Sequence, residues 1–362
     1  MGGGVSAYAA ISARVRVKYS QLLTESELGS LGATADVASL TDGLRHTPYV
    51  SAIHSLTDHQ YRVPAVIGAL KRRQAEESWS VIQAAPGNSR RVLLQLHCRH
   101  EVNNLKAVLR GIAAAAPLDT EESSRERTRK LLFPLGQHTL VPAELMFDAG
   151  NVASAIELLR GTPYYEVLSF AMKRYSSEQS LFPLEVALDL DYWRRLWQEA
   201  RKLSGEDQAQ ALRVVGSLVD ANNLMWAIRY RVYQHLTEEE LINYTLPFGH
   251  RVHDSDIRAI AGGANIGSIL GRLFPEMGDG SIFLSEPRSG LPRLELTLKR
   301  MVAVRCMGAF LGNPFHVGLP LAFLILHDLE IQDLIVLLEA KSTGMPAEEF
   351  QPYLLRSAGV VA

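Results

Sequence analysis

The densest group of side chains suited to chemistry is His97, Cys98, His100 and Glu101. In a helix the two histidines would share a face, with Glu101 one turn beyond His97, which is part of a metal-binding spacing. A zinc ion needs three or four converging ligands, and no second cluster in the sequence supplies the missing ones. The simpler interpretation is a polar helix end whose side chains are solvated or hydrogen-bonded. An enzyme that uses His97, His100 and Glu101 is the sharper alternative.

Other catalytic and cofactor motifs are missing or wrongly spaced. The glycines of GGANIG, residues 262–267, do not have the spacing of a dinucleotide-binding loop and follow no strand pattern. Walker A, His-Glu-x-x-His and Gly-x-Ser-x-Gly sequences do not occur. Cys98 and Cys306 are the only cysteines, which fits a reducing compartment and makes Cys306 a buried inert thiol by default. We therefore expect a non-catalytic chain without a catalytic residue, cofactor or metal.

The bulk composition narrows the class of protein. With 362 residues the chain is too long for one typical core and predicts two or three domains. Its 47% hydrophobic and 21% charged residues are ordinary for a globular protein. A formal net charge of −2 gives no overall basic surface, so we expect no nucleic-acid partner. The N-terminus also lacks the pattern of a secretory signal.

The elements that must position these residues are helices. Apolar residues recur at i, i+3, i+4 and i+7 through most of the chain, and alternation with a period of two is scarce. Thr24 and Thr237 each precede acidic residues, a pattern that predicts a capped helix start. We therefore predict an all-α fold.

Three marker sequences recur along the chain, which is the signature of an internal repeat. The first is EVNNLKAVLR, which recurs as DANNLMWAIR and, more weakly, as EIQDLIVLLE, at residues 101–110, 220–229 and 330–339. A second marker begins with a proline 37 or 38 residues before each copy of the first, at Pro64, Pro183 and Pro292. The third marker is Leu-Arg-x-Thr-Pro-Tyr, at residues 44–49 and 159–164.

The markers predict three similar helical-bundle domains, at residues 64–182, 183–291 and 292–362. The third copy ends early, whereas the segment ARVRVKYSQLL…LRHTPY near the N-terminus resembles the second half of a copy. We therefore expect residues 1–63 to complete the third domain and to close a ring-like, pseudo-threefold body. Two separate terminal tails are the alternative.

Each copy of the first marker places polar residues beside an apolar stripe. In a helix the acid and the polar residue three positions later lie about 60° apart, whereas the arginine at the marker's end projects from the opposite face. We call these eight residues the repeat polar anchors: Glu101, Asn104, Arg110, Asp220, Asn223, Arg229, Glu330 and Asp333. They either face a partner or form hydrogen bonds that fix the packing of each copy, and the second interpretation is the simpler one.

Residues 306–327, CMGAFLGNPFHVGLPLAFLILH, contain no Asp, Glu, Lys or Arg and are long enough to cross a bilayer if helical. The aligned segments of the first two copies contain arginines, which argues against membrane spans. Pro314 and Pro320 should interrupt a helix that starts at Cys306, and should leave only residues 321–326 as a short buried helix start. We therefore expect no transmembrane span, and the segment either packs in the core of the third copy or reaches an interface.

The chain as a whole resembles the C subunits of V/A-type rotary ATPases, which are the counterparts of the eukaryotic d subunits. Five segments in order carry the similarity: ARVRVKYSQLL near the start, LRGTPYYEVL at 159–168, FPLEVALDLDYWRRL at 182–196, DANNLMWAIRYR at 220–231 and HDLEIQDLIVLLEAKSTGMPAEEFQPYL at 327–354. The third copy departs from the family pattern at Asp333, where Asn is favoured, and at Glu339, where an Arg-like or Gly-like residue is favoured.

The resemblance implies a funnel-shaped all-α body that lies as a peripheral subunit on the cytoplasmic face of the membrane. Such a subunit belongs to the central stalk, receives the foot of the rotating shaft and rests on the membrane ring of proteolipid subunits. It would transmit torque between them during ATP-driven ion pumping or ATP synthesis, and would contact the membrane only through the ring. A stand-alone helical scaffold of the same fold with a different partner is the alternative.

Overall fold

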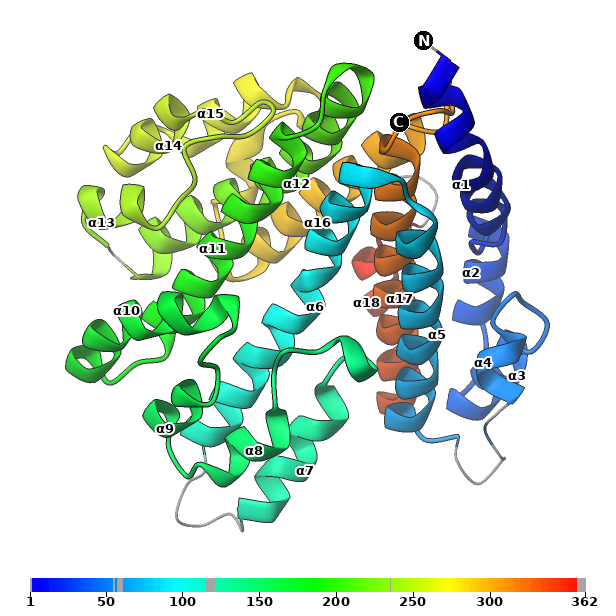
Figure 1. Cartoon of the computed structure of the whole chain (residues 1–362), viewed down its shortest axis with the longest axis horizontal. Coiled ribbons are helices and arrows are strands. Elements are labelled where there is room, and N and C mark those ends of the chain that lie inside the picture. Colours follow the sequence, from blue (N-terminus) through cyan, green and yellow to red (C-terminus); the bar gives the residue numbers. More distant parts are fainter. Residues whose placement is uncertain (1, 55, 57–60, 115–120, 235, 357–362) are drawn as a thin grey trace.

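A ring of long helices makes up the centre of the fold (Figure 1). The computed structural model describes residues 2–54, 56, 61–114, 121–234 and 236–356. Within these ranges every regular element is a helix, which confirms the all-α prediction. The helices of 20–27 residues are α5 (Val63–Ala84), α6 (Gly87–Ala113), α11 (Phe182–Arg201), α12 (Gly205–Arg229), α16 (Pro287–Gly308) and α17 (Gly318–Thr343).

These six helices form a closed cycle of contacts. In chain order each one contacts the next, and α17 contacts α5, so the last long helix meets the first. In addition, α17 contacts α6 and α12, so it lies next to both of the other helices that carry the first marker. A closed cycle of close-packed helices has no free edge and deforms little.

Shorter helices pack around the ring in three groups (Figure 1). The N-terminal group is α1 (Gly2–Ser20), α2 (Glu25–Gly32), α3 (Val37–Leu44) and α4 (Val50–His54). The helices that follow α6 are α7 (Glu121–Leu131), α8 (Ala143–Asp148), α9 (Val152–Glu157) and α10 (Pro163–Glu178). Those that follow α12 are α13 (Glu238–Asn243), α14 (Asp254–Ala261) and α15 (Ile266–Leu273). A last short helix, α18 (Ala347–Phe350), follows α17.

Two hydrophobic cores hold the helices together. The larger one runs through the long helices and the groups after α6 and α12. The second joins residues near the two ends of the chain, because Leu23, Leu40 and Tyr49 pack in one cluster with Leu337 and Phe350. The N-terminal group therefore lies against α5, α17 and α18. This arrangement is compatible with a third domain completed by residues 1–63, and the division into three copies remains a prediction.

Several helix starts follow from the local sequence. Thr24 and Thr237 each form a capping box with the acidic residue three positions later, which confirms the predicted starts of α2 and α13. The hydroxyl oxygen and the carboxylate each accept a bond from a backbone N–H that has no partner inside the helix.

The prolines of the second marker do not all stand at helix starts. Pro64 and Pro183 lie in the first turns of α5 and α11, where a missing N–H costs no helical hydrogen bond. In α16 the residue at this position is Pro287, and Pro292 lies inside the helix. The domain boundary expected at residue 292 therefore falls within α16.

The apolar segment at residues 306–327 is divided between two helices. Residues 309–317 separate α16 from α17, so no single helix runs through the segment. The expectation that Pro320 would interrupt the helix was wrong, because this proline is the third residue of α17, where a backbone N–H has no helical acceptor. All of residues 318–327 are buried, whereas Leu311 is 80% exposed. The segment is mostly core with one exposed apolar tip.

Length and apolarity sufficient for a bilayer crossing do not occur together in any helix of the described residues.

Leucines from the two parts of this segment should differ in their effect on stability. Leu321 is fully buried, and Leu321→Ala should lower the free energy of unfolding by about 2–5 kcal/mol because it leaves a cavity. Leu311→Ala, at the exposed tip, should change it by less than about 0.5 kcal/mol. Urea unfolding of the two variants measures the difference, and equal losses would contradict the assignment of core and tip.

Candidate functional site

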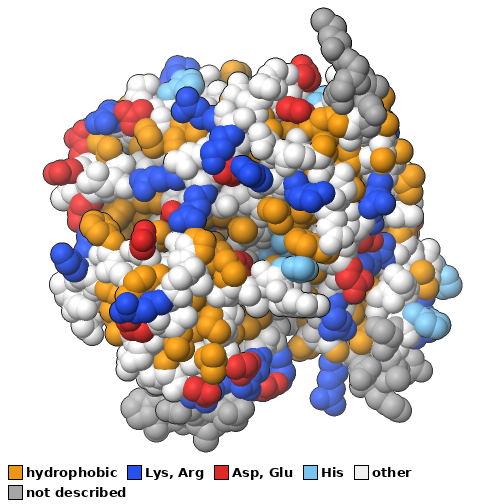
Figure 2. All heavy atoms as spheres, viewed as in Figure 1, with side chains coloured by type: hydrophobic (Ala, Val, Ile, Leu, Met, Phe, Trp, Pro, Cys, Tyr) orange, Lys and Arg blue, Asp and Glu red, His pale blue; other side chains and the backbone are white. Residues whose placement is uncertain are grey.

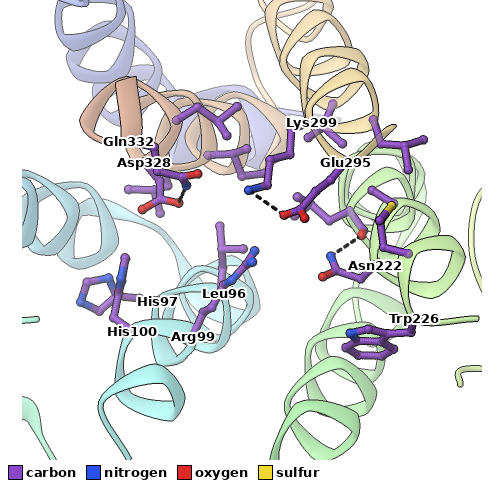
Figure 3. A pocket seen from close by; sticks show the side chains of 18 of the residues that line it. Leu96, His97, Arg99, His100, Asn222, Trp226, Glu295, Lys299, Asp328 and Gln332 are labelled. Atoms are coloured by element: carbon purple, nitrogen blue, oxygen red, sulfur yellow. Dashed lines mark hydrogen bonds and ion pairs between the residues drawn. The ribbon is translucent and has the colours of Figure 1, made fainter. Parts of the chain in front are cut away.

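The long helices surround a pocket inside the ring, which we call the central pocket (Figure 3). Side chains from α5, α6, α12, α16 and α17 line it. Figure 3 shows Arg99 of α6 pointing into this space, with Asp328 of α17 and the Glu295–Lys299 pair of α16 across from it. Trp226 lies on the α12 side of the pocket. The wall therefore presents both signs of charge from different helices.

Two histidines of the sequence cluster lie on this wall and pack on an aromatic ring. The His100 ring stacks on Phe133 with 3.8 Å between centroids, and the His97 ring meets both at an angle. Burial, together with repulsion from His100, lowers the pKa of His97 to about 3. Burial also lowers the pKa of His100. Both imidazoles are therefore neutral at neutral pH.

Glu101, the third member of the cluster, is used in a different way. Its carboxylate accepts hydrogen bonds from the Tyr164 hydroxyl at 2.6 Å, from the Thr139 hydroxyl at 3.0 Å and from the Leu140 backbone N–H. Burial raises the pKa of Cys98 to about 11, so this thiol stays protonated at neutral pH. In the part of the chain that the structure describes, no three His, Cys, Asp or Glu side chains are arranged to hold a metal ion.

Asp220, the acidic anchor of α12, also holds a segment that is distant in the chain. It accepts backbone N–H bonds from His250 and Arg251 at 2.8 Å and from Val252 at 3.1 Å. Burial raises the pKa of Asp220, against the effect of these three donors. Glu101 and Asp220 therefore bind, in each case, the connection that follows their own helix.

Glu330, the acidic anchor of α17, joins the two ends of the chain. Its carboxylate accepts the Leu23 backbone N–H and the Tyr49 hydroxyl, both at 2.7 Å, and pairs with Arg356. Arg356 in turn donates to the Leu23 carbonyl at 3.1 Å. Burial raises the pKa of Glu330 to about 7, although Arg356 and both hydrogen bonds favour the charged form. Glu101 thus binds residues that follow α6 in the chain, whereas Glu330 binds Leu23 and Tyr49 of the N-terminal group.

The two asparagine anchors each bind one backbone unit through both ends of the amide. Asn104 accepts the Phe133 N–H at 2.7 Å and donates to the Phe133 carbonyl at 2.8 Å. Asn223 does the same with Leu246, at 2.8 and 2.7 Å. An amide is suited to this task because it carries a donor and an acceptor side by side.

Asp333 stands at the corresponding position of α17 and has no donor to offer. It accepts backbone N–H bonds from Leu355 at 2.6 Å and from Arg356 at 3.0 Å instead. Burial raises the pKa of Asp333 to about 6 against these two bonds. In the first two copies an Asn thus binds the N–H and the carbonyl of one residue. In the third copy an Asp binds the N–H groups of two residues.

The arginine anchors lie at the other side of their helices and connect neighbours in the ring. Arg110 pairs with Glu185 of α11 through two contacts of 2.5 and 2.8 Å, and Arg229 pairs with Glu295 of α16 at 2.5 Å. The matching residue of α17 is the exposed Glu339, which forms no ion pair among the described residues. The joint between α17 and α5 therefore lacks this kind of contact.

The sequence prediction missed the tyrosines that complete two of the acidic anchors. Tyr49 and Tyr164 are the last residues of the two Leu-Arg-x-Thr-Pro-Tyr markers, and each donates its hydroxyl to an anchor, Glu330 or Glu101. The repeated marker was the available signal. Asp328, which lies on the central pocket, and Arg356 have no repeated counterpart and gave no such signal.

Residues 11–353 match the protein family described as ATP synthase (C/AC39) subunit. This chain belongs to that family. The C subunit of the A-type ATP synthase from Methanocaldococcus jannaschii is 23% identical over 355 residues, which cover 96% of this chain and 86% of the relative. The corresponding A-type protein from Methanothermobacter thermautotrophicus is 26% identical over 343 residues, which cover 92% and 84%. The resemblance inferred from the sequence is confirmed.

In this member of the ATP synthase (C/AC39) subunit family, the acidic and amide anchors have partners inside the chain. All six are buried, and each binds a backbone group. We therefore propose that they fix the packing of the connections and do not contact a partner protein. A buried polar group that lost such a bond would retain the cost of its desolvation.

Two neighbouring asparagines of α12 test the packing role. Asn223→Ala should lower the free energy of unfolding by about 2–4 kcal/mol, because it leaves the buried N–H and carbonyl of Leu246 without a partner. Asn222→Ala is the matched control and should cost under about 1 kcal/mol, since Asn222 only donates to the Leu218 carbonyl of its own helix. Urea unfolding gives both values, and similar losses would contradict the proposed role.

His327 should make the chain sensitive to acid. It is buried in α17, its Nδ1 has no hydrogen-bond partner, and burial lowers its pKa to about 4. The unfolded chain binds this proton below about pH 6.5 and the folded chain only below about pH 4, so stability falls as pH drops through that window. Between pH 6.5 and pH 4 the free energy of unfolding of the parent should fall. That of His327→Leu should fall by roughly 3 kcal/mol less over the same range. Urea titrations at several pH values measure this, and parallel curves would refute the buried neutral state.

Proposed function

We propose that this chain is the central-stalk coupling subunit of a V/A-type rotary ATPase. It links the rotating shaft to the ion-translocating membrane ring and transmits torque for ATP-driven ion pumping or ATP synthesis. Its partners are the central shaft subunits and the proteolipid subunits of the ring. It lies on the cytoplasmic face of the membrane as a peripheral, non-catalytic subunit, and it touches the membrane only through the ring. Nucleic acid is not among its partners.

The closed cycle of six long helices is the observation that carries the proposal. A part that passes torque between two partners must not bend or open under load. The cycle meets this demand because every long helix has a neighbour on each side, including α5 and α17. The Arg110–Glu185 and Arg229–Glu295 pairs add directional contacts across two of the joints.

The central pocket is our candidate for the seat of the shaft. Its wall combines Arg99, Asp328 and the Glu295–Lys299 pair with apolar surface such as Trp226. A shaft that turns with this subunit needs contacts that resist slipping, and charges fixed on several helices supply them in more than one direction. Burial around Asp328 would raise its pKa, but Arg99 and hydrogen bonds from Gln74 and Gln332 lower it, so the carboxylate stays charged.

Reversal of a charge in the central pocket should uncouple the enzyme. Arg99→Glu should weaken the hold on the shaft, so that ion pumping by native membranes falls severalfold while ATP hydrolysis continues. Arg91→Glu changes the same charge at an exposed position of the same helix and serves as the control. Pumping and hydrolysis are measured side by side on membranes that carry each variant, and crosslinking mass spectrometry tests whether Lys299 reaches a shaft protein.

Two outcomes would contradict the proposal. One is intact ion pumping after deletion of the chain. The other is the absence of shaft and ring subunits among the proteins crosslinked to it in native membranes. The second outcome, with another protein bound, would favour a stand-alone scaffold of the same fold.

A further inference from the structure

A second cleft adjoins the central pocket, with which it shares Ala221, Leu298 and Val302, and lies between α12, α16 and the connections around α13–α15. Its volume of about 430 Å³ is within the range of small-molecule pockets. α12 contributes Arg213, Ser217 and Asp220, which are four and three positions apart and so share one face. α16 contributes Arg305 on the facing side. We call this space the arginine cleft.

The acidic anchor of α12 builds one edge of the arginine cleft. Because Asp220 binds the backbone N–H groups of residues 250–252, it fixes His250 and Arg251 at the rim. Two glycines permit this close approach. A Cβ atom at Gly216 would lie 2.8 Å from the Cβ of His250, and one at Gly249 would lie 2.2 Å from the Asp220 Oδ1. The rim is therefore held rigidly against α12.

The positive groups of the cleft outnumber the carboxylates that face them. Arg251 pairs with Glu276 at 2.5 Å, and Asp220 is occupied by backbone donors. Arg213 has no side-chain hydrogen bond or ion pair within the described residues, and Arg305 pairs with no carboxylate there. Lys and Arg side chains also gather over α12 and its neighbours in the upper middle of Figure 2.

Arg305 meets a histidine in place of an acid. Its Nη1 lies 3.3 Å from the Nε2 of His250, and since a guanidinium only donates, that nitrogen is an acceptor and the ring is neutral. Burial, with repulsion from Arg213 and Arg251, lowers the pKa of Arg305. Burial and the nearby arginines also lower the pKa of His250. The positive charges thus repel one another around the cleft, and a bound anion would relieve the repulsion.

We propose that the arginine cleft binds a phosphate-bearing anion. Two guanidinium groups without carboxylate partners, with Arg251 beside them, offer more donors than the two oxygens of a carboxylate accept. A phosphate group has three strong acceptor oxygens and nearly two negative charges at neutral pH. The planar fork of each arginine matches pairs of these oxygens. The anion is either a soluble phosphate compound or the headgroup of a phospholipid.

The test uses the purified full chain and two phosphate probes. Inorganic pyrophosphate is titrated in a calorimeter, and vesicles of phosphatidylcholine with phosphatidylglycerol are sedimented with the protein. The variant is Arg213→Gln with Arg305→Gln. The control is Arg91→Gln with Arg293→Gln, which removes the same charge from two exposed positions. Thermal unfolding without a probe checks that the cleft variant folds, and relief of the repulsion should keep its melting temperature equal to or above that of the parent.

We expect the parent and the control to bind one of the probes, and the cleft variant to bind it at least tenfold more weakly. Pyrophosphate binding identifies a soluble phosphate compound, and vesicle binding alone identifies a lipid headgroup. Absence of binding to both probes would overturn the proposal, as would an equal loss in the control. Binding of a glutamate-rich peptide without binding of either phosphate probe would also overturn it, in favour of an acidic protein partner.

Discussion

Buried carboxylates and amides that bind the backbone of distant segments are the interaction on which the rest of this fold depends. Each of α6, α12 and α17 carries two such groups, three residues apart, on a face that is otherwise apolar. A polar group in such a place is costly unless it is hydrogen-bonded, and a charged one more so. The helix therefore packs well only when the correct connection returns to cover it. These groups would destabilise the fold if the connection packed elsewhere and left them without hydrogen bonds. They therefore favour one arrangement of the connections.

The joints of the ring are not equivalent, although the helices that form them correspond. Two joints carry an arginine–glutamate pair, between α6 and α11 and between α12 and α16. The joint between α17 and α5 instead depends on the second hydrophobic core and on polar contacts such as Gln74 to Asp328 at 2.9 Å. Ion pairs at partly exposed positions contribute little to stability, whereas the burial of large apolar side chains contributes much. The joint that closes the ring thus relies on packing.

The prediction from sequence was most reliable where a feature was repeated. The fold class followed from helical periodicity, and the anchors were found because acid, amide and arginine recur at fixed positions in the markers. The residues that bind the anchors could not be predicted, because Tyr49 lies 281 residues from Glu330 and no local pattern connects them. Proline was the other source of error, because its effect depends on its distance from the helix start. Pro320, expected to break a helix, stands in a first turn.

Because Glu330 binds Leu23 and Tyr49 of the N-terminal group, this part of the fold can be completed only after α17 has been synthesised. On the ribosome, Leu23, Leu40 and Tyr49 emerge early, but the helix that covers them emerges only after some 300 further residues. Until then these apolar side chains lack the part of their core that α17 and α18 supply, and contacts so distant in sequence form slowly because a long loop must close first. The nascent chain therefore carries a partly uncovered apolar surface until α17 has been made, which is the kind of surface that chaperones bind. The contact between α17 and α5, which closes the ring, can form only after the other five long helices have been synthesised.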